Sequence, residues 1–287
     1  MGAVYRKELK SSLCNMTGVI FIAYVLIWFG IYTVAINLMS AVSQFEYTIS
    51  SAGFISLLAL PVLTMRSFAE EKSNKTDQLL YSLPISTTSV VISKFLAMAT
   101  VFAVPIVIAS FYPFILSLYG TVYLNTAYST LIAYFFLGCA LISVGMFISS
   151  VTDSQVIAAV LNIGAIILIY FMSSIAGLFS SASSVSLACI IAVALIIAYI
   201  SYALTKNTVV GISVAAVLAG TAGIVYAVKS SLFENLFPEA LESLDVFSRT
   251  NSFVNGIFDV PAIIFYLSVT VFFGFLTVQS MEKKRWN

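Results

Sequence analysis

The chain contains no histidine, and only 9% of its 287 residues are charged. The missing histidine excludes Ser-His-Asp nucleophile triads, histidine-ligated zinc and the HExxH metalloprotease motif. Soluble domains carry about 25% charged residues. Because this chain is also 61% hydrophobic, with a mean hydropathy of +1.06, the sequence indicates a polytopic membrane protein.

The chain also has no G-x-x-x-x-G-K-[ST] loop, so it lacks the usual backbone cradle for the phosphates of ATP. No charged residue is expected near the middle of a membrane span, which argues against proton relays and intramembrane aspartyl catalysis. We therefore predict that the chain is not an enzyme, binds no cofactor or metal of its own, and has no nucleic-acid partner. Cys14, Cys139 and Cys189 are too scattered for a disulfide framework and are interpreted as packing residues.

Long charge-free runs predict an all-α fold with about eight transmembrane helices. A span needs about 20 residues, so the uncharged runs 95–152 and 154–205 must each fold back once. Such long runs without alternation exclude a β-barrel. The predicted spans cover residues 17–39, 49–65, 95–118, 127–150, 155–179, 185–205, 208–228 and 260–281. We treat residues 1–287 as a single transmembrane domain.

The distribution of basic residues predicts the topology. If both termini are cytoplasmic, eleven of the thirteen Lys and Arg residues lie inside, and only Lys229 and Arg249 lie outside. The positive-inside rule then favours cytoplasmic N- and C-termini. An even number of spans follows.

Two segments outside the predicted spans are amphipathic. In residues 1–16, apolar residues recur at helical spacing among basic residues, which predicts an interfacial N-terminal helix. In residues 229–259, an apolar stripe opposes acidic residues, which predicts an extracellular segment on the outer membrane surface. Pro238 is expected to break that segment into two short helices. A folded connecting loop without further function is an equal alternative for it.

Polar and small residues within the spans predict helix packing. Asn37 and Asn162 could each form hydrogen bonds across helices, and we interpret them as structural rather than as substrate contacts. Small residues recur at every fourth position of span seven, which allows close approach of another helix. This helix-packing stripe consists of Gly211, Ala215, Ala219 and Gly223.

The most informative segment is the charged loop 66–94 between two apolar spans. Thr76 can cap a short helix that Pro84 ends about two turns later. Thr76, Leu79, Leu80 and Leu83 share one face of it, so the loop can offer an amphipathic helix to a partner. A solvated loop lying on the lipid surface is the alternative reading.

The residues of this loop resemble a motif of type-2 ABC exporter permeases, in particular the gliding-motility-like group of bacteria. That motif has the form E-E-[RK]-x-x-G-T-x-E-x-L-x-x-x-P-[VI]-S. The corresponding residues here are Glu70-Glu71-Lys72-Ser73-Asn74-Lys75-Thr76-Asp77-Gln78-Leu79-Leu80-Tyr81-Ser82-Leu83-Pro84-Ile85-Ser86, with Ser93-Lys94 downstream. Lys75 stands where the family has Gly, in the turn before the helix, and Gln78 stands where it has Glu.

Weaker matches extend the resemblance along the chain. Residues 5–9 resemble the K-E-L opening of the family, residues 147–158 its turn between spans four and five, and residues 253–259 the approach to its last span. The resemblance implies that residues 76–83 form a coupling helix that docks on a separate ATPase subunit, which binds ATP and magnesium. The implied docking residues are Arg66, Glu70, Glu71, Thr76, Leu79, Leu80, Leu83 and Pro84.

The implied function is export of an unidentified substrate, powered by the ATPase partner, across the bacterial cytoplasmic membrane. The implied assembly contains two ATPase subunits and two permease subunits, as a homodimer or a heterodimer, surrounded by membrane lipid. An alternative from another class is a membrane anchor of a surface or motility machine, in which the ATPase moves no solute.

Overall fold

The computed structural model describes residues 2–14, 16–76, 86–180, 182–205 and 229–286, together with residues 213, 216, 217, 219–221, 225 and 226. Every regular element within these residues is a helix, so the all-α prediction is confirmed. Contacts divide the chain into two compact units. The first comprises Met1–Ile167 and Phe247–Asn287, and the second comprises Leu168–Val246.

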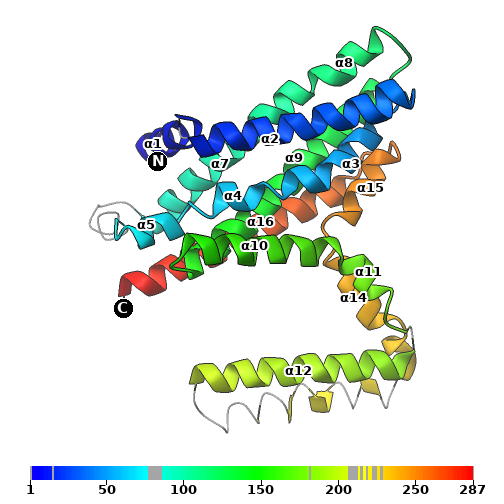
Figure 1. Cartoon of the computed structure of the whole chain (residues 1–287). Helices are drawn as coiled ribbons and strands as arrows, with labels where there is room; N and C mark the ends of the chain where they lie inside the picture. The colour runs from blue at the N-terminus through cyan, green and yellow to red at the C-terminus, as the bar shows by residue number, and fades with distance from the viewer. Residues whose placement is uncertain are drawn as a thin grey trace. The chain divides into compact units, whose positions relative to one another are not determined.

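The first unit is built around α9 (Leu124–Val151), which packs against α16 (Val260–Trp286), α7 (Thr87–Ala109), α3 (Glu46–Leu57) and α4 (Leu60–Thr64) (Figure 1). Two glycines of α9 allow close packing. A Cβ at Gly138 would overlap the Phe102 ring, and one at Gly145 would overlap Asn162 and Thr64. Small residues therefore let α9 occupy the centre of the unit.

Four helical segments within the described residues are long and apolar enough to cross a membrane: Met16–Met39, Thr87–Ser117, Leu124–Val151 and Val260–Lys283. They correspond to the predicted spans 17–39, 95–118, 127–150 and 260–281. Most of the α9 span is buried, whereas the first and last spans are mostly exposed on the unit. Their exposed aliphatic and aromatic side chains suit contact with lipid or with another subunit.

The other predicted spans are shorter or interrupted. Span 49–65 corresponds to α3 and α4, which a turn at residues 58 and 59 separates. Span 155–179 corresponds to α10 (Gln155–Tyr170) and the short α11 (Met172–Ala176). Span 185–205 falls within α12 (Ser183–Thr205), and most of span 208–228 lies outside the described residues. The count of eight spans stays a prediction.

The N-terminal residues form α1 (Gly2–Cys14), which packs mainly along α7. The hydroxyl groups of Tyr5 and Thr100 lie 3.0 Å apart and join the two helices. The chain turns sharply into α2 (Met16–Tyr32), and a Cβ on the buried Gly18 would overlap the carbonyl oxygen of Ser12. The predicted N-terminal helix is therefore present, held against α7.

α2 continues into a π-helical segment, η1 (Thr33–Met39), that contains Asn37. The Asn37 amide donates to the carbonyl oxygen of Val42 at 2.7 Å and accepts the Thr48 hydroxyl at 2.6 Å. Asn162 of α10 donates to Thr64 Oγ1 of α4 at 2.7 Å. Both asparagines thus form the hydrogen bonds across elements that the sequence predicted, with α3 and α4 respectively.

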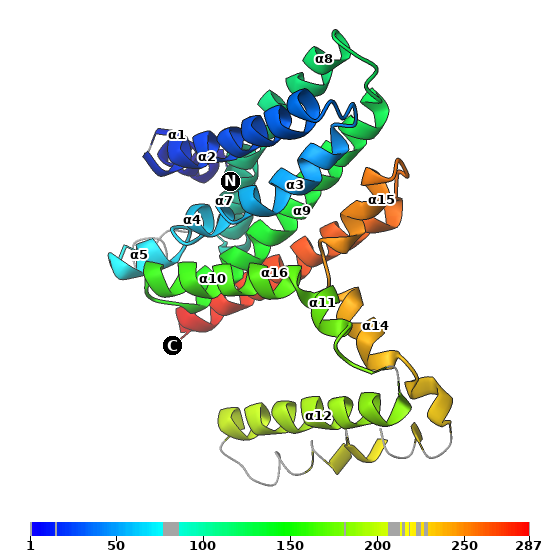
Figure 2. The ribbon, with the colours of Figure 1, turned by 45° about the vertical axis from the view of Figure 1, so that its right-hand side comes forward.

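One end of the first unit gathers α1, α5 (Ala69–Ser73) and the C-terminal part of α16, at the left of Figure 1. The opposite end carries α8 (Phe111–Ser117) and α15 (Asn251–Val254), with the 3₁₀ turn η3 (Ser248–Thr250) before α15 (Figures 1 and 2).

The second unit contains α11, α12, the 3₁₀ turn η2 (Ser230–Phe233) and α14 (Leu236–Ser243). The prediction that Pro238 breaks the 229–259 segment is wrong. Pro238 lies in the first turn of α14, where a missing N–H costs no helical hydrogen bond. The break falls at Asn235, whose φ of 61° is left-handed. Phe237 of α14 packs edge-on against Phe179, with ring centroids 5.0 Å apart.

Candidate functional site

The candidate site is the start of the 66–94 segment, where the chain forms the one-and-a-half-turn helix α5. Its N-terminus is capped from another helix, because Ser149 Oγ accepts hydrogen bonds from the backbone N–H groups of Phe68 at 3.1 Å and Ala69 at 3.0 Å. The Ser149 hydroxyl also donates to the carbonyl oxygen of Met65 at 3.2 Å. A helix this short has little stability of its own. The cap from α9 therefore fixes where α5 begins.

Lys72 fastens the other end of α5 to the C-terminus of α9. Its ammonium donates to the carbonyl oxygens of Ser150 and, at 3.1 Å, of Thr152, and lies 3.8 Å from an Asp153 carboxylate oxygen. Carbonyl groups at a helix C-terminus lack helical partners and carry the negative end of the dipole. The Lys72 ammonium both donates hydrogen bonds to these carbonyl groups and places a positive charge at the negative end of the dipole. Lys72 therefore holds α5 against the C-terminus of α9.

Lys94 of α7 is the buried charge of the site, with its side chain only 3% exposed. Its ammonium lies 2.8 Å from a Glu71 carboxylate oxygen and 3.5 Å from one of Glu8, and it donates to the carbonyl oxygen of Ser67 at 2.7 Å. The Phe68 ring lies beneath it, 5.1 Å away at its centroid. A buried cation needs such partners. Lys94 thereby joins α1, the turn before α5, α5 itself and α7.

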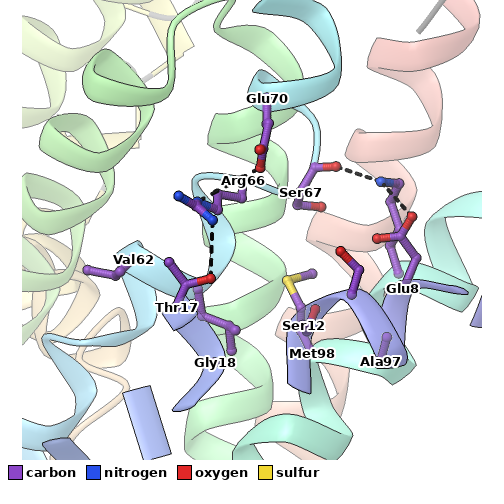
Figure 3. Close-up of a pocket in the computed structure, with 13 residues that line it drawn as sticks. Glu8, Ser12, Thr17, Gly18, Val62, Arg66, Ser67, Glu70, Ala97 and Met98 are labelled. Atoms are coloured by element: carbon purple, nitrogen blue, oxygen red, sulfur yellow. Dashed lines mark hydrogen bonds and ion pairs between the residues drawn. The ribbon is translucent and has the colours of Figure 1, made fainter. Parts of the chain in front are cut away.

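Arg66 extends the polar network to α2. Its guanidinium donates to Thr17 Oγ1 at 3.2 Å, and its Nε lies 3.8 Å from a Glu70 carboxylate oxygen (Figure 3). Beside these groups is a polar pocket of about 70 Å³. It is lined by Glu8, Ser11, Ser12, Thr17, Gly18, Val62, Leu63, Arg66, Ser67, Glu70, Lys94, Ala97 and Met98.

After α5, the chain reverses at Lys75, whose φ is 56°. This left-handed conformation is the one that glycine adopts without a Cβ penalty. The N–H of Thr76 donates to the carbonyl oxygen of Glu71 at 2.8 Å, and its hydroxyl donates to the same oxygen at 3.2 Å. The turn for which the motif has glycine is thus formed in this chain by Lys75.

The structure separates two of the predicted docking residues that the sequence treats as a pair. The Glu70 side chain is 39% exposed and faces Arg66, whereas the Glu71 side chain is 18% exposed and faces Lys94. Thr76 is exposed at the end of the described stretch. Leu79, Leu80, Leu83 and Pro84 lie outside the described residues, as do Gly211, Ala215 and Gly223 of the helix-packing stripe. Ala219 is described and half-buried.

Several residues that build this site had no role predicted from the sequence. Ser149 and Asp153 lie in the predicted turn between spans four and five, and Glu8 and Lys94 lie in segments quoted only for their resemblance. Lys94 offered one usable signal: in α7 it is a lone charge, eight positions into an otherwise uncharged helix. Such a charge requires partners. The partners of Lys94 lie 23, 27 and 86 positions away, at Glu71, Ser67 and Glu8, and no local pattern identifies them.

A second buried acidic group lies outside this network. Glu46 begins α3 and is only 2% exposed, and neither of its carboxylate oxygens has a hydrogen-bond partner among the residues that the structure describes. Burial raises the pKa of the Glu46 carboxyl, because the charged form loses its hydration there. Within the described residues, no three His, Cys, Asp or Glu side chains gather as metal ligands.

The family described as ABC-2 family transporter protein matches residues 31–202, which is more than half of the chain. The matched range includes α5 and its partners on α7 and α9, and ends within α12. No curated protein and no solved structure matches the chain.

Proposed function

Because the chain belongs to the ABC-2 family of transporter proteins, we propose that it is the permease that couples ATP hydrolysis in a separate ATPase subunit to export of a substrate. The chain itself is a membrane subunit with a transport role. The ATPase acts on the permease through the 66–94 segment, and α5 attaches this segment to the helices of the first unit. The motif at residues 70–86 supports assignment to the gliding-motility-like group and to the bacterial cytoplasmic membrane.

The observation that carries this proposal is the attachment of α5 to several helices at once. Ser149 and Lys72 tie it to α9, Glu71 ties it to Lys94 of α7 and through Lys94 to Glu8 of α1, and the adjoining Arg66 bonds to Thr17 of α2. A loop that merely lay on lipid would need none of these bonds. A displacement of this segment by the ATPase would therefore also displace the bonded parts of two candidate spans, α7 and α9, together with α1 and α2.

Docking itself is assigned to residues 76–83. A helix of about two turns is marginal alone in water and gains order when its apolar face is buried against a partner. Burying one leucine contributes about 1.5 to 3 kcal/mol. Losing Leu79 and Leu80 together thus corresponds to about 3 to 6 kcal/mol, or roughly a 10²- to 10⁴-fold weaker complex.

The experiment is co-purification of the ATPase with the Leu79→Ser/Leu80→Ser variant. The matched control is Leu178→Ser/Leu244→Ser, which changes two exposed leucines of the second unit. We expect the first variant to lose the ATPase and the second to retain it. If the first variant keeps the ATPase and its stimulated turnover at the wild-type level, the docking assignment is wrong. Substrate accumulation in vesicles then distinguishes export from the anchor of a surface or motility machine.

The proposed assembly contains two permease subunits. The proposed topology of each has eight spans and cytoplasmic termini. It is supported by the eleven of thirteen basic residues that then lie inside. Single cysteines at Ser73 and Ser243, introduced in a chain without its native cysteines, test it with a membrane-impermeant reagent on intact cells. Ser243 should react and Ser73 should not. The opposite pattern would reverse the topology.

A further inference from the structure

A groove on the surface of the first unit has the chemistry of a lipid site. It has a volume of about 530 Å³ and lies between α7 and α16, with Ser143 and Met146 of α9 at its floor. Its walls belong to two of the segments long enough to span a membrane. When these two segments span a membrane, the groove between them faces hydrocarbon rather than water.

The walls of the groove are effectively apolar. Four hydroxyl groups line it, and three of them donate to a carbonyl oxygen of their own helix: Ser143 to Ala140, Thr270 to Tyr266, and Thr277 to Phe273. These three hydroxyls are satisfied, so what remains is the surface of residues such as Ile92, Phe95 and Val271. Only the end toward the helix terminus is polar, where Thr88, Gln279 and Glu282 lie.

Glu282 gives that end a charge preference. Its carboxylate accepts the hydroxyl of Thr87 at 2.9 Å, and none of the described side chains forms an ion pair with it. A half-buried carboxylate whose partner among the described side chains is a neutral hydroxyl can also accept a cationic donor. The same Thr87–Glu282 bond joins α7 to α16 at this end.

We propose that this groove binds one acyl chain of an amine-headed phospholipid, phosphatidylethanolamine, with the ammonium group at the Glu282 carboxylate. The apolar walls accept the chain, and the carboxylate selects the head group. This site is independent of ATPase docking. The adjacent Lys283, Lys284 and Arg285 would favour anionic lipid instead, so a preference for the ethanolamine lipid distinguishes Glu282 from these basic residues.

The chain offers a matched pair of variants. Gly274 lines the groove, and a Cβ there meets nothing within 4 Å, so Gly274→Leu should fill the groove without a clash. Gly164 of α10 has equally open space but does not line the groove. Gly164→Leu is therefore the control for a leucine added to a helix. Glu282→Gln removes the charge and keeps the shape.

The experiment measures lipid affinity by native mass spectrometry of the full chain in detergent, titrated separately with dioleoyl phosphatidylethanolamine and dioleoyl phosphatidylglycerol. We expect the wild type and Gly164→Leu to bind one ethanolamine lipid about tenfold more tightly than the glycerol lipid. Gly274→Leu should weaken binding of both lipids at least tenfold. Glu282→Gln should bind both lipids about equally.

Several results would overturn the proposal. Wild-type affinity in Gly274→Leu would place the bound lipid elsewhere. A wild-type preference for phosphatidylglycerol would assign binding to the basic C-terminal residues. Conversion of a dimer to a monomer by Gly274→Leu, seen in the same spectra, would make the groove a contact between copies of the chain. If Gly274→Leu fails to fold, the Glu282→Gln comparison decides the head-group assignment independently.

Discussion

Replacing Lys94 with methionine removes the charge that holds α5 against α7 and α1. Methionine keeps most of the side-chain length and removes the cation shared by the carboxylates of Glu8 and Glu71, although Glu8 keeps the exposed Lys7 as a partner. Breaking a buried ion pair costs about 3 to 5 kcal/mol. Both carboxylate side chains are just under one-fifth exposed and keep part of their hydration. We therefore expect a loss near the lower bound, about 3 kcal/mol.

The control for this substitution is Lys7→Met, because Lys7 also pairs with Glu8, at 3.7 Å, but its side chain is 69% exposed. Exposed pairs contribute about 0.2 to 1 kcal/mol. A change of 1 kcal/mol shifts the midpoint of a chain of roughly this size by about 2 to 4 °C. Thermal unfolding in detergent should therefore show a decrease of about 6 to 12 °C for Lys94→Met. The decrease for Lys7→Met should be below about 4 °C.

A double variant tests whether the loss arises from the carboxylates left behind. Adding Glu71→Gln to Lys94→Met removes one unpaired charge and should recover part of the midpoint, although Glu71→Gln alone lowers it. Non-additivity of this kind is the signature of direct coupling. If Lys94→Met unfolds at the temperature of Lys7→Met, the buried pair contributes nothing measurable and the network does not hold α5.

Three further predictions concern backbone strain, packing and pH. Lys75→Gly should raise the unfolding midpoint, because a non-glycine residue pays about 1 to 2 kcal/mol at positive φ; an unchanged or lower midpoint would contradict the turn geometry. Gly145→Ala should lower the unfolding midpoint, because the added Cβ would overlap Asn162. Gly164→Ala should raise the midpoint, because its Cβ would meet open space and alanine favours helix. Equal shifts for the two variants would refute the close contact at Gly145. Because the folded-state pKa of Glu46 is raised, its contribution to stability is complete below the unfolded pKa of about 4.3 and is lost as pH rises through the folded-state value. Glu46→Gln should thus stabilise the protein at pH 7 to 8 and lose this advantage toward pH 4, and a pH-independent difference would rule the explanation out.

The sequence predicted those parts of the fold that depend on local composition. Uninterrupted apolar runs predicted the helices at 16–39, 87–117, 124–151 and 260–283 within three residues at each end, except that the second helix begins eight residues before its predicted span. It predicted the span at 49–65 less well, because it treated as continuous helix a segment that turns at residues 58 and 59, directly before Pro61 at the start of α4. Packing of α4 against α9, through the Thr64 and Asn162 bond, stabilises that interruption.

The break in the 229–259 segment shows why residue type alone was insufficient. Proline ends a helix only when its N–H would be needed and its ring would meet a preceding turn. At Pro238 neither condition holds, since α14 begins at Leu236. Asn235 was the better candidate, because asparagine tolerates the left-handed conformation more readily than other residues. The position of the helix start, rather than the proline itself, decided the outcome.

The candidate site combines a local signal with partners that no local signal identifies. The motif located the segment, but α5 itself is stabilised by Ser149 and by the carbonyl groups at the end of α9, about 80 residues away. Those bonds attach the first turn of α5 and its Lys72 to the same helix end. Because α5 cannot pivot at either attachment without losing hydrogen bonds, a force applied beyond Lys75 should move α5 and the end of α9 together.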